Sequence, residues 1–147
     1  LIGLFNILGT LFWGAMGGKL RMKYLLTSIY LLRSLVLTIF ILVPVTPLST
    51  YLFSAAIGLL WLATVPLTSG LVARIFGLKY MATLTGIVFF SHQLGSFVGA
   101  WLGGVFFENT GSYDTIWWIG VILGVIAAAL HLPIDDKPVE RVQPANA

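Results

Sequence analysis

The most unusual side chains in this sequence are polar groups set inside long apolar runs. Arg33 interrupts the run from Tyr24 to Val43. As its tenth residue, Arg33 would lie roughly 15 Å along a helix, near the middle of a bilayer. An arginine there costs about 2.5–3.5 kcal/mol on insertion scales, so it should face protein or water. It is a candidate anchor for an anionic solute, because guanidinium grips carboxylate with two hydrogen bonds. The alternative is a structural arginine bonded to backbone carbonyls or to an acid on a helix outside this sequence, since no acid lies within any of these apolar runs.

His92 and Gln93 form a second polar group, inside the run from Met81 to Phe107. His92 shares a helix face with Ser96, four residues later. Imidazole titrates near neutral pH, so a cavity-facing His92 could carry a coupling proton or donate to a bound solute. The alternative is a neutral histidine bonded to a neighbouring helix.

A third group, which includes Thr64 and Pro66, breaks the apolar run from Tyr51 to Ala73. Pro66 lacks an N–H group and frees the carbonyl four residues earlier, near Leu62. Such discontinuities occur where a membrane helix lines a cavity or moves. A simple kink is the alternative.

The composition leaves little for other kinds of chemistry. There is no cysteine, and two histidines and five acids offer no metal centre or catalytic dyad. A membrane enzyme that used His92 as a base would need an acid or a second histidine at the same depth, and none is visible. The eight Lys and Arg residues are spread singly, which argues against nucleic-acid binding. We therefore expect no enzyme, no cofactor and no metal.

The elements that carry these groups are membrane helices. The chain is 59% hydrophobic and only 9% charged, whereas soluble domains are about a quarter charged. A bilayer core needs roughly 20 apolar helical residues. The predicted all-α bundle covers residues 1–132, with spans at about 1–18, 24–43, 51–73, 81–107 and 115–132. Residues 133–147 are rich in proline and charge, and predict a disordered cytoplasmic tail. The start at Leu1 suggests a segment of a longer polypeptide.

Basic residues fix the expected orientation. Seven of them fall in the first connection, around the third connection or in the tail, and none falls in the other two connections. The positive-inside rule then places the C-terminus in the cytoplasm. The seven are Lys19, Arg21, Lys23, Arg74, Lys79, Lys137 and Arg141.

Glycines predict where helices meet. Gly95, Gly99 and Gly103 form two overlapping G-x-x-x-G units, which allow close backbone approach in lipid. Gly14 and Gly18 repeat this spacing at the end of the first span.

Three segments resemble a known family. The stretch 14–23 looks like the second copy of the loop G-x-L-x-D-R-x-G-R-K of the major facilitator superfamily. Gly14, Lys19 and Lys23 match it in type, whereas Gly18 replaces the Asp and Arg21 the Gly. The segment from Gly70 to Gly86 is similar to the family's tenth-to-eleventh helix connection. Ser-His-Gln-Leu-Gly at 91–95, followed by Asn-Thr-Gly-Ser-Tyr at 109–113, resembles its oxalate/formate and monocarboxylate porter branch.

The resemblance covers residues 1 to about 133 and implies helices eight to twelve of a twelve-helix transporter. It implies alternating access between two six-helix halves, the N-terminal half being a missing partner, and a small solute such as a monocarboxylate or another organic anion. The family's tenth and eleventh helices face the path, which favours Thr64, Pro66, His92 and Gln93 as path residues. Its ninth helix is peripheral, which argues against Arg33. The expected location is a bacterial plasma membrane, and the rival interpretation is a non-transporting membrane scaffold.

Overall fold

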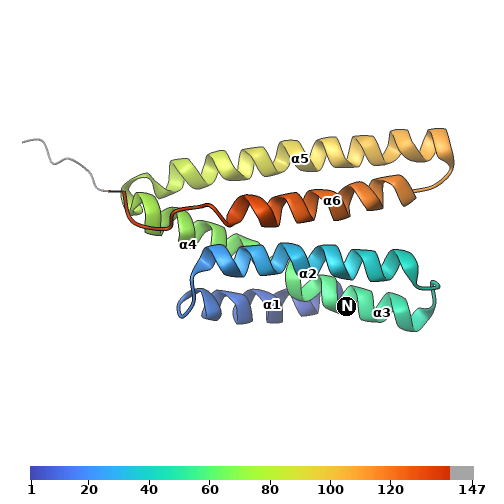
Figure 1. The fold of residues 1–147 in the computed structure, drawn as a ribbon, viewed down its shortest axis with the longest axis horizontal. Coiled ribbons are helices and arrows are strands. Elements are labelled where there is room, and N and C mark those ends of the chain that lie inside the picture. Colours follow the sequence, from blue (N-terminus) through green and yellow to red (C-terminus); the bar gives the residue numbers. More distant parts are fainter. Residues whose placement is uncertain (140–147) are drawn as a thin grey trace, which may run out of the picture.

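The computed structural model describes residues 1–139, and every regular element in that range is a helix. The order is α1 (Ile2–Gly17), α2 (Met22–Leu42), α3 (Pro47–Trp61), α4 (Thr64–Phe76), a 3-10 turn (Leu78–Tyr80), α5 (Met81–Thr110) and α6 (Asp114–His131). The helices run side by side along the long axis of the molecule (Figure 1). The predicted all-α class is confirmed.

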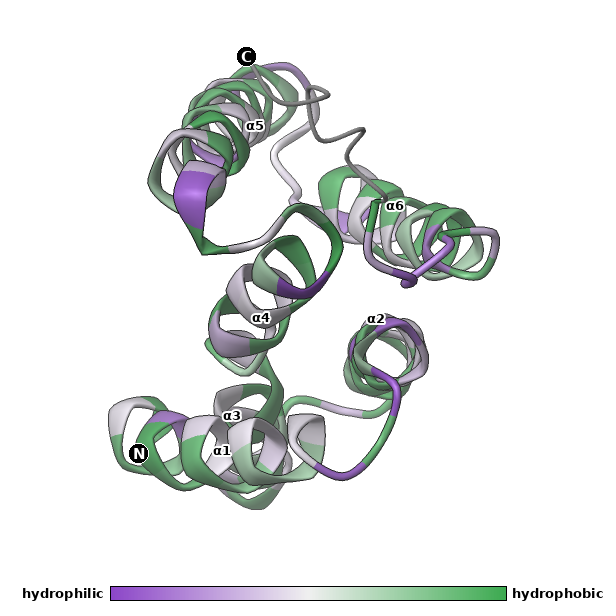
Figure 2. Ribbon diagram, turned by 90° about the vertical axis from the view of Figure 1, so that its left-hand side faces the viewer, coloured by the Kyte–Doolittle hydropathy of each residue, from purple (hydrophilic) through white to green (hydrophobic). Residues whose placement is uncertain are grey.

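Four stretches among the described residues are long and apolar enough to cross a membrane: 22–42, 47–76, 78–110 and 114–131. The remaining helix, α1, is apolar but has only 16 residues. Apolar residues cover much of every helix, and the hydrophilic ones are concentrated at the near helix ends and connections (Figure 2). This is the pattern of helices whose sides face lipid or other helices rather than water.

Local sequence signals set several helix ends. Thr46 and Ser49 form a capping box at the start of α3, and Pro47 occupies its first turn, where its missing N–H is not needed. At the C-terminal ends of α4 and α5, Gly77 and Gly111 take φ values of 77° and 69°, which side chains other than glycine rarely tolerate.

The third span is broken. Helix α3 ends at Trp61 and α4 begins at Thr64, and the Val65 N–H donates to the Leu62 carbonyl at 3.1 Å in a tighter turn. Pro66 is the third residue of α4, where first-turn N–H groups have no acceptor within the helix. Its ring would clash with the Leu62 carbonyl if the helix continued unbroken. The discontinuity predicted at Pro66 is therefore present, four residues before the proline.

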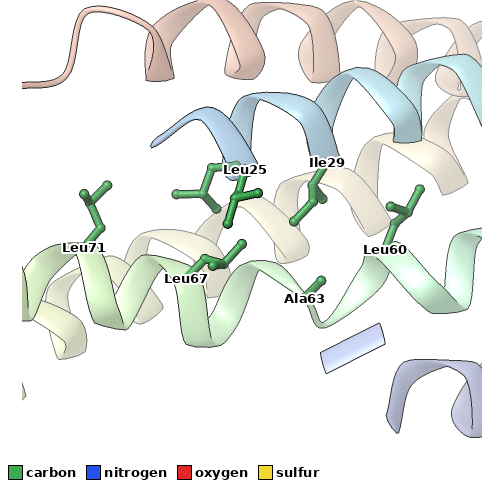
Figure 3. Packing of buried hydrophobic residues seen from close by; sticks show 7 residues of the cluster. Leu25, Ile29, Leu60, Ala63, Leu67 and Leu71 are labelled. Carbon is green, nitrogen blue, oxygen red and sulfur yellow. The ribbon is translucent and has the colours of Figure 1, made fainter. Parts of the chain in front are cut away.

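The core lies between α2 and the two halves of the broken span. Leu25 and Ile29 of α2 face Leu60, Ala63 and Leu67 (Figure 3). On its other side α2 packs along α6, so it is the central helix of the described bundle. Helix α5 stands apart, because Gly103 is its only buried residue.

Close helix contacts occur at glycines other than those predicted. A Cβ atom on Gly9 of α1 would lie 2.1 Å from the Leu59 carbonyl oxygen of α3, and one on Gly58 of α3 would lie 2.8 Å from the Ile2 oxygen of α1. On α6, a Cβ atom on Gly124 would lie 2.2 Å from the Ser34 hydroxyl of α2. Each pair of helices meets at a glycine, which has no side chain to hold the two backbones apart.

The predicted glycines make no close contact of this kind. A Cβ atom on Gly95, Gly99 or Gly103 would meet nothing within 4 Å among the described residues. Gly14 has only ordinary contact with Pro66 at 3.9 Å, and Gly18 faces only a carbonyl of its own helix end. Within residues 1–139, Gly14 and Gly18 make no close helix contact, and α1 approaches α3 most closely at Gly9.

The predicted disordered tail is wrong for residues 133–139. The Val139 N–H donates to the Ile75 carbonyl at 2.9 Å, and Asp136 is only 2% exposed. This segment crosses the end of the bundle and binds it through backbone and charged groups. Residues 140–147, including Arg141, lie outside the described residues.

We expect Gly9→Ala to destabilise the bundle by about 1–3 kcal/mol, because the new methyl group must push α1 away from the α3 backbone. Gly3→Ala on the same helix is the matched control, since nothing lies within 4 Å of its Cβ position. The control should be neutral or slightly stabilising, because alanine favours helix over glycine. Unfolding in detergent measures both, and equal stability of the two variants would contradict the contact.

Candidate functional site

Arg33 bonds to backbone carbonyls at the break in the third span. Its Nε and Nη2 atoms donate to the Leu60 carbonyl at 3.2 and 2.6 Å, and Nη2 also donates to the Trp61 carbonyl. These are the last two residues of α3, where carbonyls lose their partners in the helix. The guanidinium carbon also lies 5.3 Å from the Trp61 ring centroid and 5.4 Å from that of Tyr30. The structure thus matches the structural alternative for Arg33.

Asn6 of α1 forms a hydrogen bond with the backbone at the same break. The Leu62 N–H donates to the Asn6 Oδ1 atom at 3.2 Å. Asn6 lies on α1 and Arg33 on α2, so two helices supply the polar groups that the broken span needs. Asn6 is a candidate functional residue that was not singled out from the sequence. The available signal was a lone amide in an apolar run.

Thr64 and Pro66 lie in the first turn of α4, directly after the break, and both are half-buried. Pro66 lies next to Gly14 of α1. The break therefore gathers three of the predicted site residues, Arg33, Thr64 and Pro66, in one part of the bundle.

His92 and Gln93 lie elsewhere, on the exposed part of α5. The Ser96 hydroxyl donates to the His92 carbonyl at 3.0 Å, a bond within the helix. Among residues 1–139 no hydrogen bond or ion pair joins the side chain of His92 or Gln93 to the residues at the break. The described chain leaves this face of α5 open.

A cavity of about 490 Å³ lies beside the break, between α1, α2, α3 and α6. Its lining is aromatic and aliphatic, with Phe53, Trp61 and Trp117 prominent, and it includes the Asn6 amide. A smaller cavity of about 320 Å³ between α2 and α3 is lined almost entirely by apolar side chains. Volumes of this order suit small molecules.

Apart from Arg33, the Lys and Arg residues of the described chain gather at one end of the bundle. The connections 18–21 and 77–80 and residues 133–139 all lie at the left end in Figure 1. There Arg21 makes two hydrogen bonds to Asp136, one of them from Nε to Oδ2 at 3.1 Å. The Asp136 side chain is 3% exposed and that of Arg21 is 49% exposed. The bond to Arg21 lowers the pKa of the Asp136 carboxyl to about 2, and it raises the pKa of Arg21.

Lys23 ties the same segment to α2. Its Nζ atom donates to the Ile134 carbonyl at 2.7 Å and to the Leu132 carbonyl at 3.3 Å, just past the end of α6. A cation is favourable there, because the last carbonyls of a helix carry partial negative charge. Of the predicted loop residues, Lys23 is buried in this contact, Lys19 is exposed and Gly14 lies beside the broken span. Sequence reasoning missed Asp136, although an acid in the basic end was a usable signal.

No group of three or more His, Asp or Glu side chains in the described part of the chain could hold a metal ion.

The sequence model of a protein family, the Major Facilitator Superfamily, matches residues 1–147. A relative, the uncharacterized MFS-type transporter YcxA of Bacillus subtilis (strain 168), is 28% identical over 141 residues. The match covers 92% of this chain and 35% of the relative, so the chain spans about a third of that protein's length. No solved structure matches the chain.

We expect the Arg21–Asp136 pair to make stability pH-dependent in acid. The folded-state pKa of Asp136, about 2, lies below the ordinary value of 3.8. Its contribution is therefore present above about pH 4 and is lost as the pH falls from 4 towards 2. Asp136→Asn should lower the thermal stability at pH 7 and remove this part of the acid dependence.

Thermal unfolding in detergent between pH 7 and pH 3 measures this effect. Asp135→Asn is the matched control, because the Asp135 carboxylate, next to Asp136 in the chain, is exposed. Parallel pH profiles for wild type and Asp136→Asn would contradict the role of the pair.

Proposed function

The chain belongs to the Major Facilitator Superfamily, and on that premise we propose that it forms part of a secondary transporter that moves a small solute by alternating access. The observation that carries the proposal is the family match over the whole chain, together with a third span that is broken and polar at membrane depth. Broken membrane helices are favoured where a segment lines a path or changes shape.

We propose that the five spans are helices eight to twelve of a twelve-helix protein in a bacterial plasma membrane. The basic end of the bundle would face the cytoplasm, together with the C-terminus. The likeness to a protein of Bacillus subtilis supports a bacterial membrane. The sidedness rests on Lys19, Arg21, Lys23, Arg74 and Lys79, which lie at or beside connections on the same end.

Four residues are proposed to face the path: Thr64 and Pro66 on α4, and His92 and Gln93 on α5. The exposure of His92 and Gln93 supports this role, because polar side chains at membrane depth face protein or water rather than lipid. His92 would carry a proton or donate a hydrogen bond to the solute. We propose that the solute is a monocarboxylate or another organic anion. Proton-coupled symport or antiport follows from the same residue. Arg33 is left out of the path, because its guanidinium is bonded to the carbonyls of α3.

The open glycine face of α5 is proposed to receive a helix from the N-terminal part of the transporter. Helices α1 and α5 carry the same pattern, since Leu-Gly-Thr at 8–10 with Gly-Gly at 17–18 matches Leu-Gly-Ser at 94–96 with Gly-Gly at 103–104. On α1, Gly9 of this pattern contacts α3. We infer that Gly95, Gly99 and Gly103 contact an equivalent helix outside this sequence.

We expect His92→Ala to reduce uptake about tenfold or more near neutral pH, and to flatten its pH dependence, because the imidazole proposed to carry the proton is gone. The measurement uses the intact natural polypeptide containing this sequence, in proteoliposomes, with radiolabelled formate, oxalate, lactate and pyruvate. His131→Ala is the matched control, because that imidazole lies at the end of α6 and bonds to the Ala127 carbonyl at 2.6 Å.

Uptake by His92→Ala that equals wild type at every pH would remove His92 from the mechanism. A folded wild-type protein that transports none of these anions, and that none of them stabilises against heat, would contradict the anion class. If a broad solute panel also gave no uptake and no stabilisation, a membrane scaffold would be the better interpretation.

A further inference from the structure

The structure assigns Arg33 and Asn6 a positioning role at the broken third span. We propose that the last carbonyls of α3 form a cation site, that the guanidinium of Arg33 is its built-in occupant, and that Asn6 completes the junction. Together they keep the span broken and fix where α4 begins. The consequence for transport rests on the proposed function, whereas the structural claim does not.

The carbonyl side of the junction has the chemistry of a site for a planar monovalent cation. Leu60 and Trp61 present two carbonyl oxygens at the C-terminal end of α3, where the helix dipole adds partial negative charge. Three hydrogen bonds from Arg33 reach these oxygens. The aromatic rings of Tyr30 and Trp61 lie within cation–π range of the same guanidinium.

One N–H group at the junction, that of Leu62, is bonded by a different helix. Asn6 of α1 accepts the hydrogen bond of the Leu62 N–H at 3.2 Å. The close contact of α1 with α3 at Gly9 and Gly58 brings the Asn6 amide within reach. At the break, Arg33 of α2 therefore donates to the last α3 carbonyls, Asn6 of α1 accepts from the Leu62 N–H, and the Val65 N–H donates to the Leu62 carbonyl. These bonds stabilise the junction, because lipid offers no hydrogen bonds to a backbone.

The arrangement predicts that Arg33 and Pro66 are coupled. In a continuous helix the N–H groups of Thr64 and Val65 would bond to the Leu60 and Trp61 carbonyls, at the usual spacing of four residues. Pro66 opposes that continuous helix, and in the broken span Arg33 takes over both carbonyls. Pro66→Ala should allow the helix to close, and Arg33 should then matter less.

The first experiment compares thermal stability in the intact natural polypeptide for wild type, Arg33→Ala, Pro66→Ala and the double variant. Arg33→Ala should lower the melting temperature, and the same change in the Pro66→Ala background should lower it by less than half as much. Equal losses in both backgrounds would overturn the coupling.

The second experiment supplies the cation from solution. Guanidinium at about 20 mM, far below the molar range in which it denatures proteins, should restore at least half of the melting temperature lost in Arg33→Ala. Sodium and potassium at the same concentration are the ionic controls and should not restore it. Arg74→Ala is the matched variant, because that arginine lies at the end of α4, away from the break, and guanidinium should leave it unchanged. Failure of guanidinium to rescue Arg33→Ala more than Arg74→Ala would overturn the cation site.

Two further readouts cover poor folding and transport. If Arg33→Ala does not fold on its own, expression in the presence of guanidinium, or in the Pro66→Ala background, should recover folded protein, and no recovery in either would overturn the proposal.

In transport assays Arg33→Ala should lower the maximal uptake rate by about tenfold with little change in KM. A large rise in KM with an unchanged maximal rate would instead make Arg33 a solute anchor. The stability readouts need no transported solute, so they stand even if the proposed function fails.

Discussion

A membrane helix that breaks must have its backbone groups satisfied by protein, because the hydrocarbon core offers no hydrogen bonds. This constraint shapes the centre of the bundle. The third span breaks between Trp61 and Thr64, and the groups exposed there are bonded by Arg33 from α2 and Asn6 from α1. Helices α1 and α2 both lie close enough to the break for these side chains to reach it. Helix α1 approaches α3 closely at glycines, and the apolar core of α2 lies against both halves of the broken span. The break is therefore a connected part of the bundle and more than a local kink.

The two ends of the bundle are held by different forces. At the basic end, Arg21 and Lys23 bind the segment that follows α6, so charged groups join the first connection to the end of the described chain. At the other end the contacts are aromatic, because Phe40 stacks on Phe53 at 4.1 Å and both rings lie near Trp117. Charged contacts at a membrane surface respond to pH and salt, whereas aromatic contacts do not. Helix α5 takes little part in either set.

The sequence predicted those features that depend on one residue and its neighbours along the chain. Helical apolar runs, the break caused by Pro66 and the basic end all follow from local patterns. Features that depend on which helices meet could not be predicted in this way. Arg33 was expected to bind either a solute or carbonyls, and only the position of α3 beside α2 decides between them. The close contacts at Gly9, Gly58 and Gly124 were not predicted for the same reason, since spacing shows that a helix can be approached but names no partner. Asp136 was missed because a proline-rich, charged segment resembles a disordered tail until Arg21 and Lys23 are seen beside it.

The Arg33 guanidinium caps the end of α3. Solid-state NMR in lipid bilayers tests this contact directly, with nitrogen-15 in the arginine guanidinium and carbon-13 in the Leu60 and Trp61 carbonyls. We predict strong dipolar dephasing of both carbonyl signals by the Arg33 nitrogens, as expected for hydrogen-bonded groups, with the dephasing lost in Arg33→Lys. The lysine control removes the labelled guanidinium but keeps the positive charge. Carbonyl signals that are not dephased in the wild-type protein would show that Arg33 points elsewhere, and the account of the broken span would then be wrong.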